Sequence, residues 1–209
     1  MNSIHSWGFR FMSISTESLK TSLKNERDTT ARTKLLLDFM RATGQTFYDE
    51  SVTQLAHALQ CAHLAVKANA DDATVVGALL HDFGHFLQNE HADNGDFLKS
   101  DLLHEDVAAD FLAEFLPKSV VEPIRFHVLA KRYLCTVDEA YHDQLSPASQ
   151  NSLRLQGGKL TEAEVDELKK NPHLEAILQV RRWDDLAKKA GKVVPTLETY
   201  TDQLTSTWL

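Results

Sequence analysis

The pattern of apolar residues in this chain permits helices and little else. No stretch rich in Val, Ile and Thr alternates apolar and polar residues for more than a few positions, so the period of a half-buried strand is missing. Helix-favouring residues dominate instead, and an apolar stripe of helical spacing is formed by Leu35, Leu36, Phe39 and Met40. Hydrophobic residues make up 43% of the 209 positions, which is enough for a buried core. We therefore predict an all-α fold.

Capping residues, glycines and prolines set the expected bounds of the helices. A short apolar helix should begin after Asp71 or Asp72 and run into His81. Thr161 and Glu164 have the spacing of a capping box, which marks another helix start. The remaining expected elements are helices over 17–42, 51–68, 102–115, 119–133 and 173–190, with polar loops over 88–98 and 145–160.

Length, charge and cysteine content narrow the class of protein. We expect an N-terminal arm over 1–16 and a single domain over 17–209, because no long linker divides the chain. Lys and Arg number 22 against 30 Asp and Glu, and the resulting net charge of −8 argues against a nucleic-acid partner. No apolar run reaches the roughly 18 residues that a membrane span requires. Two isolated cysteines, Cys61 and Cys135, fit a reducing compartment, so we expect a cytoplasmic protein.

A His-Asp pair, His81 and Asp82, closes the short apolar helix. Taken alone, such a pair is most simply a structural His beside a capping Asp. Here, however, the preceding helix is apolar almost all round, and an unpaired charge is costly in such surroundings. A bound cation would compensate the negative charge of the Asp82 carboxylate.

Four further residues are expected to converge on this pair. His57 lies on the preceding helix, which must pack against the short one because the connection between them is short. His104 and His127 have apolar neighbours that indicate buried rings, and Asp184 lies inside a helix, where Asp has no local advantage. Imidazole and carboxylate donors without thiolate suit iron, manganese or zinc. Six donors exceed what one ion with an open position needs, so we predict two metals.

The order of these residues resembles the signature of the HD-domain superfamily, which is a His, then an adjacent His-Asp pair, then a distal Asp. Local strings narrow the resemblance to the HD-domain mixed-valent di-iron oxygenases, and among them to the PhnZ-like phosphonate oxygenase branch, relatives of myo-inositol oxygenase. Those strings are Gln54-x-x-His57-x-Leu59-Gln60-Cys61-Ala62, Leu79-Leu80-His81-Asp82-Phe83-Gly84-His85, His127-Val128-x-Ala130-Lys131-Arg132-Tyr133-Leu134, Leu145-Ser146-x-Ala148-Ser149, Leu155-Gln156-Gly157-Gly158 and Arg181-x-Trp183-Asp184.

The resemblance implies a helical bundle with a five-helix core around two iron ions, Fe(II) and Fe(III), with O2 as co-substrate. One iron would be held by His57, His81, Asp82 and Asp184, and the other by His104 and His127, with Asp82 bridging the two. The residues that would hold the phosphonate group of a substrate are His85, Lys131, Ser149 and Arg181, with Gln156 as a weaker candidate. Ammonium and guanidinium donors suit such a dianionic group.

Three of these substrate contacts also have a simpler interpretation. The charge of Lys131 can simply interact with the dipole at the C-terminal end of its helix. Arg181 can belong to a solvent-exposed face, and Ser149 can cap a turn. The position of Lys131 four residues after His127 favours the substrate role, because it places the ammonium on the helix face that carries the metal ligand.

The sequence departs from the family pattern at the expected gate. Family members can carry a tyrosine that covers an open iron position and a nearby glutamate that meets the amine of the substrate. Glu50 matches that glutamate, but Phe47 stands where the tyrosine is expected and Tyr48 follows it. We take Tyr48 as the gating candidate and Glu50 as a substrate contact, and the choice between Phe47 and Tyr48 stays open.

The implied reaction is oxidative cleavage of the C–P bond of a small 1-hydroxyphosphonate, such as 2-amino-1-hydroxyethylphosphonate, to phosphate and a carboxylic acid. An upstream 2-oxoglutarate-dependent hydroxylase would supply this organophosphonate without forming a stable complex. Two alternatives stay open. The same donors suit a metal-dependent HD phosphohydrolase acting on a small phosphate ester or nucleotide, and they also suit a metal-stabilised binding or regulatory protein without turnover.

Overall fold

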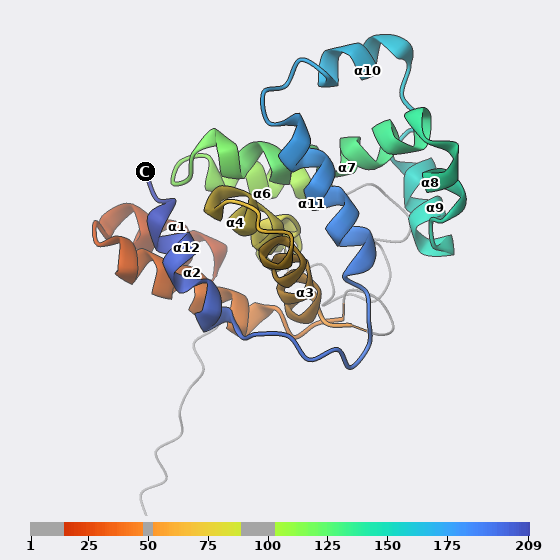
Figure 1. The fold of residues 1–209 in the computed structure, drawn as a ribbon. Helices are drawn as coiled ribbons and strands as arrows, with labels where there is room; N and C mark the ends of the chain where they lie inside the picture. Colours follow the sequence, from red (N-terminus) through yellow and green to blue (C-terminus); the bar gives the residue numbers. More distant parts are fainter. Residues whose placement is uncertain (1–14, 48–51, 89–102) are drawn as a thin grey trace, which may run out of the picture.

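The structure is a computed structural model that describes residues 15–47, 52–88 and 103–209, and every regular element in these ranges is helical (Figure 1). The prediction of an all-α fold is confirmed. None of the described helices combines the length and apolar composition that crossing a membrane requires. The expected arm over 1–16 lies almost wholly outside the described residues, as does the loop over 88–98.

The described residues form a series of helices. Their bounds are α1 Thr16–Asn25, α2 Thr29–Thr43, α3 Gln54–Lys67, α4 Asp72–Leu80, α5 Phe83–Gln88, α6 His104–Leu112, α7 Lys118–Val137, α8 Glu139–Asp143, α9 Pro147–Leu155, α10 Glu162–Leu168, α11 Leu174–Leu186, η3 Leu197–Tyr200 and α12 Thr201–Ser206.

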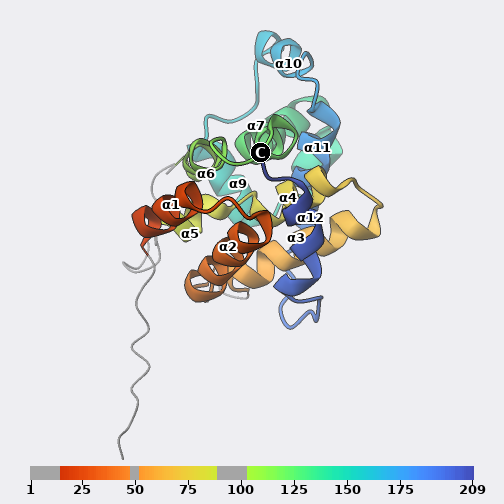
Figure 2. The ribbon, with the colours of Figure 1, turned by 90° about the vertical axis from the view of Figure 1, so that its left-hand side faces the viewer.

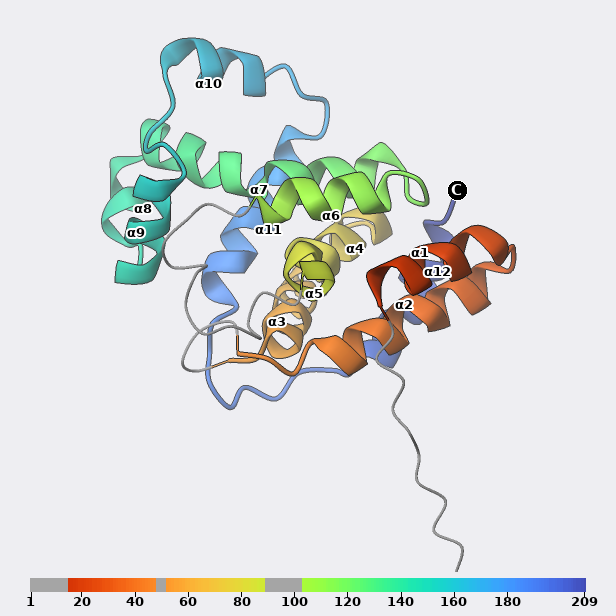
Figure 3. The same ribbon diagram turned by 180° about the vertical axis from the view of Figure 1, so that it is seen from behind.

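Five helices pack together as the centre of the fold. Helix α11 contacts α7, α3 and α4, while α4 and α6 also lie against α7 (Figure 1). Helix α4 is buried almost all round, as its sequence predicted, and its last residues Leu79 and Leu80 are at most 1% exposed. Helix α5 packs beside α6 (Figure 3). All the histidines and aspartates expected to bind metal come from these five helices or from the turn after α4.

The prediction of a single long helix over 17–42 is wrong, because two helices, α1 and α2, occupy this stretch. Glu26 takes an extended conformation after α1, and its carboxylate accepts hydrogen bonds from the backbone N–H groups of Arg27 and Asp28. Asp28 in turn caps α2 by accepting from the Ala31 N–H. These side chains satisfy the backbone at the break, so the chain turns where helix propensity alone would continue.

The prediction of a loop over 145–160 is also wrong in part, since α9 occupies most of this range. Ser146 caps α9 by accepting from the Ser149 N–H, and Pro147 occupies its first position. Proline is favourable there because its missing N–H has no helical partner in any case. The capping box of Thr161 and Glu164 is confirmed at the start of α10.

The C-terminal segment closes the side of the molecule away from α8 and α9. Helix α12 packs against α2 and α4 (Figure 2). Beyond it, the Trp208 indole donates to the Thr33 hydroxyl over 2.8 Å, and the Leu209 N–H donates to the Phe115 carbonyl over 3.0 Å. These bonds tie the last residues to α2 and to the end of α6.

Candidate metal centre

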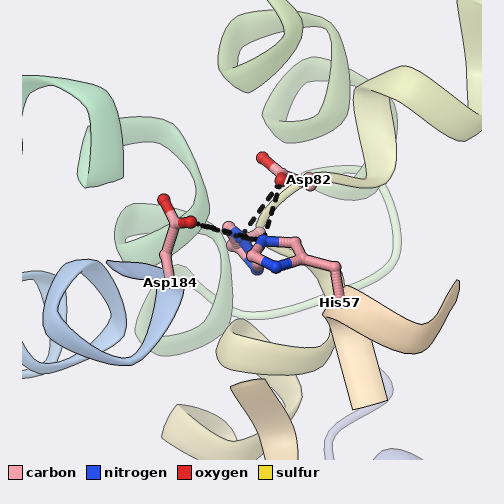
Figure 4. Close-up of side chains that lie close together, drawn as sticks. His57, Asp82 and Asp184 are labelled. Carbon is pink, nitrogen blue, oxygen red and sulfur yellow. Dashed lines mark hydrogen bonds and ion pairs between the residues drawn. The ribbon is translucent and has the colours of Figure 1, made fainter. Parts of the chain in front are cut away.

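The structure brings all six predicted metal donors together. His57 lies in the first turn of α3, His81 and Asp82 follow α4, His104 begins α6, His127 lies inside α7 and Asp184 near the end of α11. All except His104 are at most 3% exposed. Single donor atoms of four of them lie within 4.8 Å of one another, namely those of His57, His81, Asp82 and Asp184. Figure 4 shows three of these side chains pointing toward one another from separate parts of the fold.

Asp82 lies between two pairs of histidines, and each of its oxygens faces one pair. Its Oδ2 is 3.3 Å from the His57 Nε2 and 3.2 Å from the His81 Nε2. Its Oδ1 is 3.2 Å from the His104 Nε2 and 3.4 Å from the His127 Nε2. This is the arrangement in which one carboxylate bridges two ions. Asp184 joins the first pair only, with its Oδ1 3.3 Å from the His57 Nε2.

The histidine rings are oriented so that their Nε2 atoms point into the site. The Nδ1 atoms of His57, His81 and His127 lie 3.0, 2.9 and 2.7 Å from the backbone carbonyls of Ala187, Ala78 and Ile124. A carbonyl can only accept, so each Nδ1 donates its N–H to the backbone, and this directs each Nε2 into the site.

The Nε2 atoms also lie close to one another in two pairs. The Nε2 atoms of His57 and His81 are 3.1 Å apart, and those of His104 and His127 are 3.2 Å apart. Asp82 Oδ2 and Asp184 Oδ1 are buried and accept no hydrogen bond within the described structure. Buried acceptors without donors are costly, and metal ions at both positions would satisfy them. The donor set therefore fits a pair of metal ions.

The pKa values of the site also indicate that its carboxylates stabilise positive charge nearby. Burial alone would lower the pKa of His57, but the two neighbouring carboxylates raise it to about 9. Burial likewise opposes the charged forms of His81 and Asp82, yet their mutual attraction raises the pKa of His81 and holds that of Asp82 well below its usual range. At His104 and His127 burial prevails and lowers the pKa. The first histidine pair thus lies in the more negative half of the site.

Arg181 is buried beside the metal donors and holds one of them. It is 3% exposed, which excludes the solvated-face interpretation. Its Nη1 contacts Asp184 Oδ2 at 2.6 Å, while its Nε and Nη2 bond the carboxylate of Asp185. The Tyr141 hydroxyl donates to the same carboxylate over 2.5 Å. Lys188 contacts the other oxygen of Asp184 at 3.3 Å. The carboxylate of Asp184 is therefore fixed by cations on its outer side.

The remaining predicted substrate contacts lie on α7 and around α9. Lys131 is 3% exposed, and its ammonium donates to the Ser152 hydroxyl over 2.8 Å. Ser149 is buried, and its hydroxyl accepts from Ser146. Gln156 is the residue that ends α9, and its buried Oε1 has no hydrogen-bond partner in the described part of the chain. Helix α9 thus brings the Ser152 hydroxyl to the buried ammonium of Lys131.

His85 lies on the other side of the site, on α5. Its ring stacks on that of His104, with centroids 4.1 Å apart and planes 18° apart. Single donor atoms of Asp82, His85 and His104 lie within 4.8 Å of one another. Of the expected gate, Phe47 is 60% exposed, and Tyr48 and Glu50 lie outside the described residues.

Four contributors to the site were missed by sequence reasoning. Asp185 holds Arg181 and accepts from Tyr141, Lys188 contacts Asp184, and Ser152 accepts from the ammonium of Lys131. Asp185 follows a predicted metal ligand directly, and Ser152 lies one helical turn after Ser149, so spacing gave a weak signal for both. Nothing near Tyr141 in the sequence indicates its long-range contact.

Comparison with known proteins decides the family. The family model described as HD domain matches residues 55–187, which contain all six donors. The chain belongs to the HD-domain family. It is 50% identical over 175 residues to a hydroxymethylphosphonate dioxygenase of Gimesia maris, a match covering 84% of this chain and 87% of the relative.

Two further relatives of this HD-domain protein are more distant. It is 40% identical to a [1-hydroxy-2-(trimethylamino)ethyl]phosphonate dioxygenase (glycine-betaine-forming) of Leisingera caerulea, with 75% of this chain and 80% of that protein covered. It is 33% identical to an uncharacterised protein of Acanthamoeba polyphaga mimivirus, over 75% of this chain and 72% of the relative. The PhnZ-like oxygenase resemblance predicted from the motifs is confirmed.

Proposed function

We propose that this HD-domain protein is a mixed-valent Fe(II)/Fe(III) oxygenase that uses O2 to cleave the C–P bond of a small 1-hydroxyphosphonate. The observation that carries this proposal is the position of Asp82, whose two oxygens each face a separate pair of histidine Nε2 atoms. Two-metal sites also occur in phosphatases and nucleases, and the identity of 50% and 40% to two phosphonate dioxygenases favours oxidation over hydrolysis.

The side chains divide between the two ions as their positions suggest. His57, His81 and Asp184 would hold the first iron, His104 and His127 the second, and Asp82 would bridge them. Nitrogen and oxygen donors without sulfur suit iron. When bound, the irons supply the one-electron chemistry with O2 that no amino-acid side chain provides.

The cationic side chains would bind the phosphonate. Lys131 contributes a buried ammonium, Ser149 lies on the adjoining α9, and Gln156 directly follows that helix. The Nη1 of Arg181 contacts Asp184, and its Nε and Nη2 donate to Asp185. One further N–H on each of Nη1 and Nη2 would then donate to a substrate oxygen. The His85 imidazole would donate a hydrogen bond to the phosphonate from the side of the second iron. These groups would neutralise the phosphonate dianion and exclude water around it.

The names of the two dioxygenase relatives indicate what the substrates share. Both contain a carbon that bears a hydroxyl and a phosphonate, and they differ in the substituent on that carbon. For hydroxymethylphosphonate, addition of O2 balances to formate and phosphate without an outside reductant. We propose this compound as the first substrate to test, with 2-amino-1-hydroxyethylphosphonate as the second. A 2-oxoglutarate-dependent hydroxylase is the class of enzyme that would supply them, in the cytoplasm, where the free Cys61 and Cys135 stay reduced.

An assay with and without O2 tests the proposal. Iron-loaded protein is incubated with hydroxymethylphosphonate, 2-amino-1-hydroxyethylphosphonate, its trimethylamino analogue and a simple phosphate monoester, and O2 uptake is recorded together with phosphate release. We expect at least one phosphonate to release phosphate in proportion to O2 consumed and to release none under argon. Phosphate release from the monoester at the same rate under argon and air would instead identify a hydrolase.

A further inference from the structure

The two halves of the metal centre do not have equal numbers of donors. On one side, His57, His81 and Asp184 join one oxygen of Asp82, which gives four donors. On the other side, only His104 and His127 join the second oxygen, which gives three. Two histidines and one carboxylate leave coordination positions open on an iron, so the second position can take a further donor.

His85 lies beside this second position. It follows Asp82 by three residues, and its backbone N–H donates to the Asp82 carbonyl over 3.1 Å, so both side chains leave the same turn. The ring of His85 is half-buried and stacks on that of His104 with centroids 4.1 Å apart. The other ring pairs of the site meet at steeper angles, 64° for His57 with His81 and 55° for His104 with His127.

The spacing of the donor atoms fits coordination of one ion. Single atoms of Asp82, His85 and His104 lie within 4.8 Å of one another. Two donors that bind one ion at bond lengths of about 2.1 Å are separated by up to about 4.2 Å, depending on the angle between the bonds. A small rotation of a half-buried ring therefore suffices to bring all three atoms to a common ion.

We propose that His85 is a fourth protein ligand of the second metal position in the substrate-free protein, and that substrate binding releases it. This inference rests on the proposed function, because the group that replaces His85 would be an oxygen of the hydroxyphosphonate. After release, the same imidazole is placed to donate to the phosphonate. His85 would thus occupy the open coordination position until substrate arrives.

Metal retention in the absence of turnover tests this role. Anaerobic Fe(II)-loaded wild-type protein, His85→Ala and His85→Gln are challenged with a chromogenic chelator, and His142→Ala, which removes a histidine from α8, serves as the matched control. We expect two phases of iron release from the wild type and the control. In both His85 variants the faster phase should accelerate at least about tenfold, while the slower phase stays unchanged. Hydroxymethylphosphonate added without O2 should slow the fast phase in the variants.

Unchanged release of both irons from the two variants, with a raised KM for hydroxymethylphosphonate, would overturn the proposal and leave His85 as a substrate contact only. Failure of the proposed function would appear elsewhere, in the wild-type protein. That protein would then hold fewer than two irons per chain, or would release phosphate without consuming O2. Circular dichroism of each variant shows whether the fold is retained, and His85→Gln keeps most of the side-chain volume.

Discussion

A single residue, Asp82, joins the two halves of the site, and the histidines on either side should therefore act on separate ions. We expect His104→Ala to lose one of two irons and all O2-dependent phosphate release, because the second ion would keep only His127 and one oxygen of Asp82 among the predicted ligands. Metal analysis and circular dichroism check this, with His142→Ala as the control. Retention of two irons by His104→Ala would show that the second position is held by other residues.

Lys131 differs from an ordinary lysine because it is buried beside another cation. Burial and the charge of Arg181 lower the pKa of Lys131 to about 7. Its ammonium form is present below that pH and is lost as pH rises through it. We expect Lys131→Met to raise the KM for a hydroxyphosphonate about tenfold or more near pH 6, with both irons retained. The difference from wild type should shrink by about pH 8.5.

Steady-state kinetics across this pH range test the role of the ammonium, and comparing the variant with wild type removes the effect of substrate ionisation. The exposed Lys170 supplies the control, Lys170→Met, which should match wild type at every pH. An equal KM for Lys131→Met and wild type near pH 6 would refute a role for this ammonium in substrate binding.

The residues of the site differ in how far the sequence could predict them. The roles of His57, His81 and Asp184 follow from residue type and spacing, since buried imidazole and carboxylate groups need a partner wherever they occur. Arg181 was predicted as a substrate contact, yet much of its guanidinium is occupied by Asp184 and Asp185. Both contacts join residues three and four positions apart within α11, so helical spacing gave a signal for them.

At the scale of elements, the close contact between α5 and α6 positions His104. A Cβ atom on Gly84 would lie 2.0 Å from the His104 carbonyl oxygen, so any side chain there pushes the two helices apart. We expect Gly84→Ala to lower the free energy of unfolding by about 2 kcal/mol or more and to weaken binding of the second iron. Chemical denaturation and metal analysis of the same samples measure both effects.

Gly77 provides a matched control for this substitution, because it lies inside α4 and the nearest atoms to an added Cβ are 3.4 Å away. Gly77→Ala should change stability by less than about 1 kcal/mol, since the gain in helix propensity offsets the tighter packing. Equal effects of the two substitutions would mean that the contact between Gly84 and His104 has no special importance.

Helix content was easier to predict than helix ends. The apolar run of α4 and its cap at Asp71 were sufficient to predict where this helix begins and ends, because burial and capping favour the same bounds. The break between α1 and α2 was missed because it depends on side-chain bonds of Glu26 and Asp28 to the backbone, which compete with a locally favourable helix. Helix α9 was missed because glycines after it, Gly157 and Gly158, indicated a loop.

At the scale of the whole molecule, the metal centre should stabilise the fold. Its donors come from α3, α6, α7, α11 and the turn after α4, so bound ions would join separate helices. Ions present at about a thousand times their dissociation constant would add about 4 kcal/mol. We expect chelation to lower the Tm by about 10 °C, as read from the loss of helical circular dichroism. An unchanged Tm would mean that the helices do not depend on the ions.

The number and position of the bound ions test the central claim most directly. Crystals of the iron-loaded protein, measured at the iron absorption edge, would show each ion as an anomalous peak. We expect two peaks roughly 3.5 to 4 Å apart, one on either side of Asp82, with His104 and His127 at the second. A single peak among His57, His81 and Asp184 would contradict the dinuclear site and, with it, the oxygenase.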